Sequence, residues 1–449
     1  MRWILSISLL ATCAAVRAQD APDAPIPEHE DPIMLDAARC VAIALAHNPQ
    51  LASATEDVAA AKARVGEARG ARLPQVQVDS TYTYIDGFPI DLYSGGAFSF
   101  LTGSITANKW QVMSGVQLEQ VLFAGGRLQA AQKASAFLAA SQHWQRRAIR
   151  DEVEFAAKQG FYNLLLAQRL HEVADARVAA FERHLRDSRE ALEVGLVSRF
   201  QVLRAETELG ARISEQTAAA SQTRLAQVNL LRTLGQPQHT PVAVAGDLAG
   251  NAPGADLQGL IDKALDNRAE LHAIEAGIAA AEQRVREAKG AHLPRAGAHV
   301  RYDDLDGGTQ VMPDGWSVSV GVEWELFAGG SRRASLAEAK ARVRSLGHQR
   351  AELRQLVELD VRSAWLAIEE ADARILAEEK TRALAEEGLR MAELRYQEGV
   401  GTQAEVIDAE TALSAARTQL AEARHAHAVA CAALEQAIGH TWAPETPGL

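Results

Sequence analysis

The second half of this chain copies its first half, and this duplication constrains the fold more than any local pattern does. The segment from Glu67 to Pro74 reads EARGARLP and recurs from Glu287 to Pro294 as EAKGAHLP, an offset of 220 residues. The segment LFAGG occurs at 122–126 and again at 326–330, an offset of 204 residues that holds along the rest of the copy. We therefore expect two structural units of one kind.

The N-terminus has the anatomy of a secretory signal. Met1 and Arg2 precede an apolar stretch that ends in Val16-Arg17-Ala18, which predicts a signal peptide at 1–18. The segment around Cys13 also resembles a lipoprotein cleavage box, although threonine is atypical before that cysteine. Residues 19–34 contain prolines among charges, which indicates an extended leader.

Charge and hydropathy exclude several classes of function. The net charge is -12 and no basic run offers a footprint for phosphates, so nucleic acid is not an expected partner. Beyond the signal, the sequence has no run of about 18 apolar residues that would make a transmembrane helix. An exported chain without such a helix spans a membrane only as part of a closed β-barrel.

Proline is absent from two long stretches, 90–236 and 314–443. Because a proline inside a helix is destabilising by about 3 kcal/mol, its absence permits uninterrupted helix. Residues 127–194 alone suit one helix that is roughly 100 Å long. A rod of this length does not fit inside a compact domain, so we expect long antiparallel helix hairpins at about 127–235 and about 331–439.

The returning helix of the second copy carries a coiled-coil seam. Two sets of residues each recur at intervals of seven: Val406, Leu413, Leu420, His427 and Leu434, and Ala409, Ala416, Ala423, Ala430 and Ala437. Alanine at one position of every heptad allows neighbouring helices to approach closely. A lone amphipathic surface helix is the alternative, which five consecutive heptads disfavour.

Four segments alternate between apolar and polar residues and predict two β-hairpins, at about 75–123 and about 295–327. Their apolar faces are Val76, Val78, Tyr82 and Tyr84; Trp110, Val112, Val116 and Leu118; Ala296, Ala298, Val300 and Tyr302; and Trp316, Val318, Val320, Val322 and Trp324. Such strands suit the lipid-facing wall of a barrel, and they suit an ordinary half-buried sheet equally well.

Four strands are too few to close a barrel, and open sheet edges in hydrocarbon are prohibitively unfavourable. Several chains must then share one barrel if the strands lie in a membrane. Two chains would supply eight strands around a filled interior, whereas three would supply twelve around a lumen. The polar inner faces favour three chains.

Other reactive residues are expected to be structural. Leu260 is the repeat counterpart of Cys40, which predicts that Cys40 and Cys431 are unpaired core thiols. His425 and His427 form a His-x-His pair, but on a helix they point in different directions. We predict no catalytic residue, no metal site and no cofactor, and therefore no enzymatic activity.

These features together resemble the TolC-type outer membrane efflux protein family, also called outer membrane factors. In both copies a Leu-Pro pair precedes the first strand, at Leu73 and Leu293, and the segment LFAGG stands at the end of the second strand. The resemblance implies a mixed α and β fold with an internal two-fold repeat and four barrel strands per chain. A homotrimer would form a twelve-stranded outer membrane barrel that continues into a periplasmic coiled-coil tunnel. The first repeat would span 35–245 and the second 246–449.

The resemblance also implies functional positions at the helix tips. Adaptor-docking positions would be Val194, Gly195, Leu196, Glu398, Gly399 and Val400, and channel-constricting positions would be Tyr396, Glu405 and Asp408. The chain departs from the best-known members at the closing latch, where Gly401 replaces an arginine and Gln201 an aspartate. Arg199 and Arg204 are therefore candidates to pair with the two carboxylates.

The function that this resemblance implies is a passive exit duct for small molecules or polypeptides. It would lie in the outer membrane, extend into the periplasm, and work with a periplasmic adaptor (a membrane fusion protein) and an inner-membrane pump. A periplasmic coiled-coil adaptor or scaffold is the alternative. Such a scaffold would share the helices but would have no use for four strands with outward aromatic residues.

Overall fold

The computed structural model describes residues 33–84, 110–195, 197–248, 250, 256–306 and 315–439. The expected signal peptide and most of the expected leader lie outside these residues. In chain order the elements are β1 (Ile33–Leu35), α1 (Ala37–His47), α2 (Pro49–Gly70), β2 (Gln75–Tyr84), β3 (Trp110–Phe123), α3 (Arg127–Glu193), α4 (Arg199–Leu234), β4 (Val242–Val244), α5 (Leu257–Asn267), α6 (Ala269–Gly290), β5 (Arg295–Asp306), β6 (Gly315–Glu323), α7 (Ser331–Gln397) and α8 (Gln403–Ile438).

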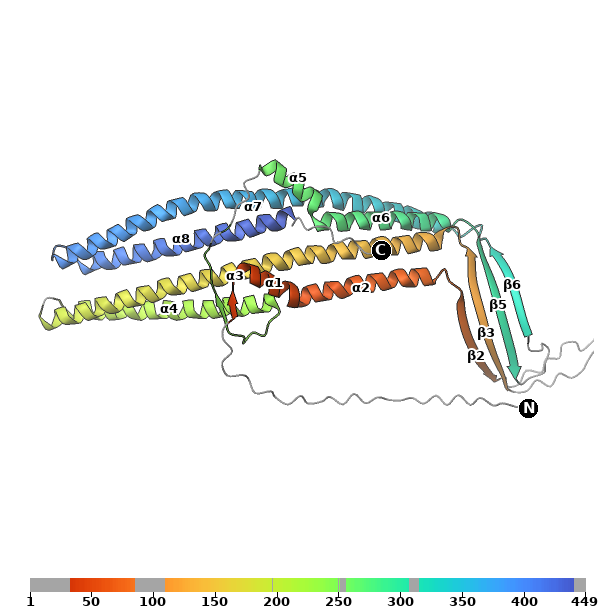
Figure 1. Ribbon diagram of the computed structural model, residues 1–449, viewed down its shortest axis with the longest axis horizontal. Coiled ribbons are helices and arrows are strands. Elements are labelled where there is room, and N and C mark those ends of the chain that lie inside the picture. The colour runs from red at the N-terminus through yellow and green to blue at the C-terminus, as the bar shows by residue number, and fades with distance from the viewer. Residues whose placement is uncertain are drawn as a thin grey trace, which may run out of the picture.

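Four long helices run side by side and point away from a β-sheet at the other end of the molecule (Figure 1). Helix α3 packs against α4 and α8, and α8 packs against α3 and α7. Helices α4 and α7 therefore lie at the two edges of this layer. Both α3 and α7 continue for 67 residues without a break, as the proline-free stretches predicted.

The helices of the two halves match in length. Helices α1 and α5 have 11 residues each, α2 and α6 have 22, and α4 and α8 have 36. Their surroundings differ, because α3 packs against both α2 and α6 whereas α7 packs against α6. None of the described helices is both long and apolar enough to cross a membrane.

Two apolar clusters hold these helices together, one where α1 meets α3 and α4 and one where α5 meets α7 and α8. Their largest fully buried members are Leu35, Val153, Leu164, Leu230 and Leu234 in the first, and Ile261, Val357, Val361 and Leu434 in the second. Cys40 lies in the first cluster and Cys431 in the second, and both are free thiols, as predicted. Burial raises the pKa of Cys40 to about 12 and that of Cys431 to about 11, so neither is a reactive thiolate.

The heptad seam of α8 is also confirmed. Eight of its predicted residues are buried: Val406, Leu413, Ala416, Leu420, Ala423, Ala430, Leu434 and Ala437. Beside this core, β1 and β4 form a short parallel pair, with Ile33 opposite Val242, that the sequence analysis did not predict.

The other strands form one antiparallel sheet in the order β2-β3-β5-β6. The two hairpins therefore join through β3 and β5, and β2 and β6 are the edges. One face carries highly exposed apolar side chains on both edge strands, including Val78, Tyr82, Trp316 and Val318. An exposed apolar face of this size indicates contact with another molecule or with lipid.

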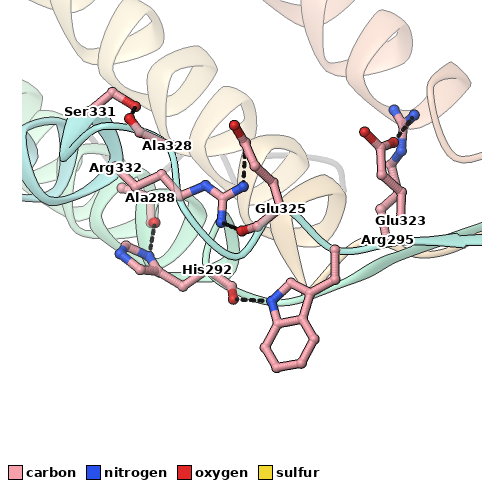
Figure 2. A network of polar contacts seen from close by, with 9 residues as sticks. Ala288, His292, Arg295, Glu323, Glu325, Ala328, Ser331 and Arg332 are labelled. Atoms are coloured by element: carbon pink, nitrogen blue, oxygen red, sulfur yellow. Dashed lines mark hydrogen bonds and ion pairs between the residues drawn. The ribbon is translucent and has the colours of Figure 1, made fainter.

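Strand β6 ends at Glu323, earlier than the predicted end near residue 327. The chain then turns, because the Arg332 guanidinium donates to both the carbonyl and the carboxylate of Glu325 (Figure 2). The indole N–H of Trp324 donates to the carbonyl of His292 at 3.1 Å. Strand β3 continues further, to Phe123, because β5 pairs with it on that side, whereas β6 is an edge.

Candidate functional site

The first helix tip is a tight turn between α3 and α4. Gly195 has φ +75°, a left-handed conformation that favours glycine, and its N–H donates to the carbonyl of Leu192 at 3.0 Å. Val194 is exposed beside it. The Ser198 N–H donates to the side-chain oxygen of Gln201 at 2.9 Å, so Gln201 caps α4. Leu196 lies outside the described residues.

The second tip joins α7 to α8 through a similar turn. Gly399 has φ +73°, and the N–H groups of Val400 and Gly401 both donate to the carbonyl of Arg395, at 3.0 and 2.8 Å. A Cβ added at Gly401 would lie 3.0 Å from backbone atoms of both Arg395 and Tyr396. A side chain at position 401 would therefore require this turn to shift.

Glu405 lies in the first turn of α8 at this tip and has a partner that the sequence analysis missed. Its carboxylate lies 3.5 Å from Nε of Arg395, and its N–H donates to the Thr402 hydroxyl at 3.3 Å. Both side chains of the ion pair are about half exposed, so the pair contributes little to stability. Arg395 is ten residues away in sequence, and only the path of the turn brings it close.

Among the described residues, the other expected gate residues form no hydrogen bond or ion pair with one another. Asp408 is exposed one helical turn beyond Glu405, and Tyr396 is half-buried at the end of α7. Arg199 and Arg204 are both exposed on α4, and neither forms an ion pair with a described residue of the same chain. The suggested pairing of these arginines with Glu405 or Asp408 is therefore not present in a single chain.

The two hairpins are joined just above their tips. The side-chain amide of Gln403 donates to the hydroxyl of Ser188 at 2.6 Å, and Ser188 donates in turn to the carbonyl of His184 at 2.7 Å. Ser188 is almost completely buried. This polar contact fixes the start of α8 against α3.

Glu410 is a further charged group near this joint that the sequence analysis did not identify. Burial raises the pKa of its carboxyl, and the nearby carboxylate of Glu393 raises it further. Arg183, Arg417 and Arg177 act in the opposite direction. The pKa of the Glu410 carboxyl on α8 therefore lies above its ordinary value.

At the opposite end of the molecule, the polar face of the sheet carries a charged network. The Arg301 guanidinium donates to Asp303 at 2.7 Å, to Gln117 at 2.9 Å and to Asp79 at 3.0 Å. A Cβ at Gly115 would lie 2.8 Å from the Asp303 carboxylate, so glycine makes room for this network. The network links three of the four strands.

The paired histidines of α8 contact different helices. His425 lies 2.7 Å from the side chain of Asn163 on α3, and His427 lies 3.2 Å from the carboxylate of Asp372 on α7. Within the described ranges, no three histidine, cysteine or acidic side chains are grouped so that they could hold a metal ion.

Comparison with known proteins assigns this architecture to a family. The family model described as outer membrane efflux protein matches residues 41–236 and 260–440, which is most of the chain. The chain therefore belongs to the outer membrane efflux protein family. It lies in the outer membrane and extends into the periplasm, as its relatives do.

Among curated relatives, the outer membrane efflux protein BepC of Brucella suis is 27% identical over 78% of this chain and 77% of its own length. The outer membrane protein TolC of Escherichia coli is 22% identical over 87% of this chain and 80% of its own length.

Solved outer membrane channels have the same fold. The channel CmeC of Campylobacter jejuni matches with a TM-score of 0.78 at 15% identity, over 90% of this chain and 85% of its own. The outer-membrane channel OprN matches with a TM-score of 0.76 at 20% identity, over 91% of each chain.

Proposed function

We propose that three copies of this chain form a passive duct that leads from the periplasm to the exterior. Each chain would contribute four strands to a twelve-stranded barrel and four long helices to a tunnel below it. Because each chain contains two repeats, the wall would consist of six similar units. The observation that carries this proposal is the four-stranded sheet with two open edges and an exposed apolar face.

The edges of the helical layer support the same assembly. Helix α7 exposes leucine side chains along its length, and α4 exposes Leu203, Ile213 and Leu225. In a closed ring of three chains, the α7 edge of one chain would meet the α4 edge of the next. Closed cyclic symmetry leaves neither edge open.

The gate would lie at the helix tips. Three copies of Glu405 and Asp408 would place six carboxylates around the narrow end of the tunnel, with Tyr396 beside them. A ring of carboxylates at a pore mouth favours cations and repels anions. Arg199 and Arg204 have no ionic partner among the described residues of their own chain, so we infer that they pair with these carboxylates across the boundary between chains in the closed state.

The turns themselves would be the docking positions for a periplasmic adaptor. Val194 and Val400 are exposed there, next to two glycines that shape the turns. Leu196 and Glu398 would complete the contact. An inner-membrane pump would supply the energy through this adaptor, and the channel itself would have no catalytic role.

Conductance in planar lipid bilayers tests the duct and its gate. We expect cation-selective channels, with selectivity reduced in a variant that combines Glu405→Gln and Asp408→Asn. The charge reversal Arg204→Glu should raise the open probability, whereas Arg224→Glu, an exposed arginine further along α4, should not. Protein that forms no channels would contradict the duct, and unchanged gating in Arg204→Glu would contradict the proposed pairing alone.

The alternative of a periplasmic adaptor or scaffold is not favoured. The curated relatives are outer membrane proteins, and a periplasmic scaffold would leave the apolar sheet face in water. In this proposal the pump would select the cargo and the channel would provide the exit path.

A further inference from the structure

We infer that the helix ends next to the sheet form a basic collar that binds anionic phospholipids of the periplasmic leaflet of the outer membrane. The collar consists of the exposed lysines and arginines at 60–75, 124–140, 280–295 and 328–344, where α2, α3, α6 and α7 meet the sheet (Figure 1). This inference goes beyond the proposed duct. It uses the location in the outer membrane and does not depend on the number of chains in the assembly.

These four segments carry a positive charge that the chain as a whole does not have. They contain 15 lysines and arginines against four glutamates, whereas the whole chain has 46 basic and 58 acidic residues. The segments lie far apart in sequence, so no basic run is visible there, and the fold brings them together at one end of the helices. A concentration of one sign of charge at one level of the molecule indicates an anionic partner at that level.

Most of these charges have no ionic partner in the chain. Among the described residues, only three of the 15 pair with a carboxylate, and these three are Arg284, Arg295 and Arg332. The other twelve side chains are all exposed. An anion that approaches the collar therefore meets guanidinium and ammonium groups that are not already neutralised.

Helix dipoles do not account for the collar. Arg69 and Lys289 lie in the last turns of α2 and α6, where a positive charge is favourable. Arg127 and Arg333, however, lie in the first turns of α3 and α7, where a positive charge opposes the dipole. Neither first turn contains an acidic residue that would offset it. Basic residues at both kinds of helix end indicate that an anion outside the chain stabilises them.

An exposed apolar rim lies between the collar and the sheet. Trp324 continues the apolar alternation of β6 toward the helices. Leu122 and Phe123 end β3, which has a neighbouring strand on each side, so strand pairing does not cover them. The rim residues are each about half exposed or more and are Leu73, Leu122, Phe123, Trp324, Leu326 and Phe327.

The apolar sheet face, the rim and the collar follow one another as acyl chains, interface and headgroups do in a membrane leaflet. Tryptophan is enriched at the interface between membrane and water, and clusters of lysine and arginine beside it bind anionic headgroups. Because the helices extend into the periplasm, the collar lies at the periplasmic leaflet. The phospholipids of this leaflet, and not the lipid A of the outer leaflet, are therefore the occupants.

Lipid retention by the intact protein tests the inference. Protein extracted in mild detergent would be mixed with equal amounts of phosphatidylglycerol and phosphatidylcholine, and native mass spectrometry would count the lipids that stay bound. We expect about ten-fold more phosphatidylglycerol than phosphatidylcholine, because each basic group beside an anionic headgroup strengthens binding by about five-fold. This preference should weaken as the salt concentration rises.

The variant that tests the collar combines Arg69→Gln, Lys289→Gln and Arg333→Gln. These side chains are exposed and have no carboxylate partner among the described residues, so we expect the chain to fold. The preference for phosphatidylglycerol should fall below about two-fold. The conservative variant that combines Arg69→Lys and Arg333→Lys should keep it, because the headgroup responds to the charge.

The matched control removes three exposed charges of α7 that also have no carboxylate partner among the described residues. They begin about 30 Å along the helix from Arg333. The control combines Arg354→Gln, Arg362→Gln and Lys380→Gln. It should keep the preference of the wild type.

The outcomes separate this inference from the proposed function. Equal retention of the two phospholipids by the wild type, or equal losses in the collar variant and the control, would overturn the collar. Lipid A retained more strongly than phosphatidylglycerol would overturn the assignment to the periplasmic leaflet. Wild-type protein that forms channels without a lipid preference would contradict this inference alone, whereas protein that prefers phosphatidylglycerol but forms no channels would contradict the duct alone.

Discussion

Helices α3 and α7 have the same length and matching places in the two halves, yet 13 residues of α3 are buried and only 5 of α7. Helix α3 is covered by α2, α6, α4 and α8, whereas one side of α7 lies open. On this open side leucines are exposed that would be costly to leave in water. This difference supports the proposed trimer, in which another chain would cover the open side of the second half, as the second half covers the first.

The largest expected effect concerns the covered helix. Phe161 is 3% exposed in the first apolar cluster, so Phe161→Ala should lower the free energy of unfolding by about 3–5 kcal/mol. On α7, Leu376→Ala should change it by less than about 0.5 kcal/mol, because Leu376 is 63% exposed and its counterpart, Glu172, is also exposed. Denaturant titration of the detergent-solubilised protein measures both. Equal losses would contradict the comparison.

Two exposed leucines of α7 distinguish the side that a neighbouring chain would cover from the side that faces solvent. Leu384 is 74% exposed, but its counterpart on α3, Ala180, is buried. We therefore expect Leu384→Asp to destabilise the trimer by about 2–3 kcal/mol, because the charge would be buried between chains. The dissociation temperature of the trimer in detergent measures the effect. Leu376→Asp is the control and should leave that temperature unchanged.

A third prediction concerns an ionisable group that α3 has and α7 lacks. Burial raises the pKa of Asp151 to about 6, and Gln355 stands at the matching position of α7. Arg147 and Arg150 lower this pKa, and Glu154 and Glu270 raise it.

Since the unfolded carboxyl ionises near pH 4, the stability that neutral Asp151 provides is present below pH 4 and is lost as the pH rises through 6. Asp151→Asn should therefore match the wild type near pH 4 and be more stable at pH 7.5. We expect a gain of about 1 kcal/mol, because solvent partly screens this group. Thermal unfolding measured across this pH range tests the sign, and a loss of stability at pH 7.5 would contradict it.

The smallest expected effect compares the two hairpins near their tips. In the first hairpin Arg189 on α3 pairs with Glu206 on α4 at 2.7 Å. At the matching positions the second hairpin has two acids, Glu393 and Glu410, and the pKa of Glu410 is raised. Glu393→Arg should lower that pKa and stabilise the second hairpin at neutral pH by about 0.5 kcal/mol. Thermal unfolding at pH 5 and pH 8 should show the larger gain at pH 8, and Glu393→Gln should give an intermediate gain.

Much of the fold was predictable from the sequence because its signals are periodic. The absence of proline predicted α3 and α7, the heptads predicted the buried face of α8, and the alternation predicted the four strands. These signals depend on one residue and its near neighbours, so they need no knowledge of the tertiary structure.

The contacts at the tips were not predictable in the same way. The pairing of Arg395 with Glu405, the close packing of Gly401, and the capping of α4 by Gln201 depend on the path of each turn and on which helix faces align. The sequence contains no periodic signal for such contacts. The early end of β6 was missed for a related reason, because it depends on which strand has a neighbour.

The mass of the intact protein, extracted from outer membranes in mild detergent and measured by native mass spectrometry, tests the central claim most directly. The account predicts a complex of three chains whose dissociation temperature falls when α7 carries a charge at position 384. A single chain that stays dispersed after the detergent is removed would contradict it.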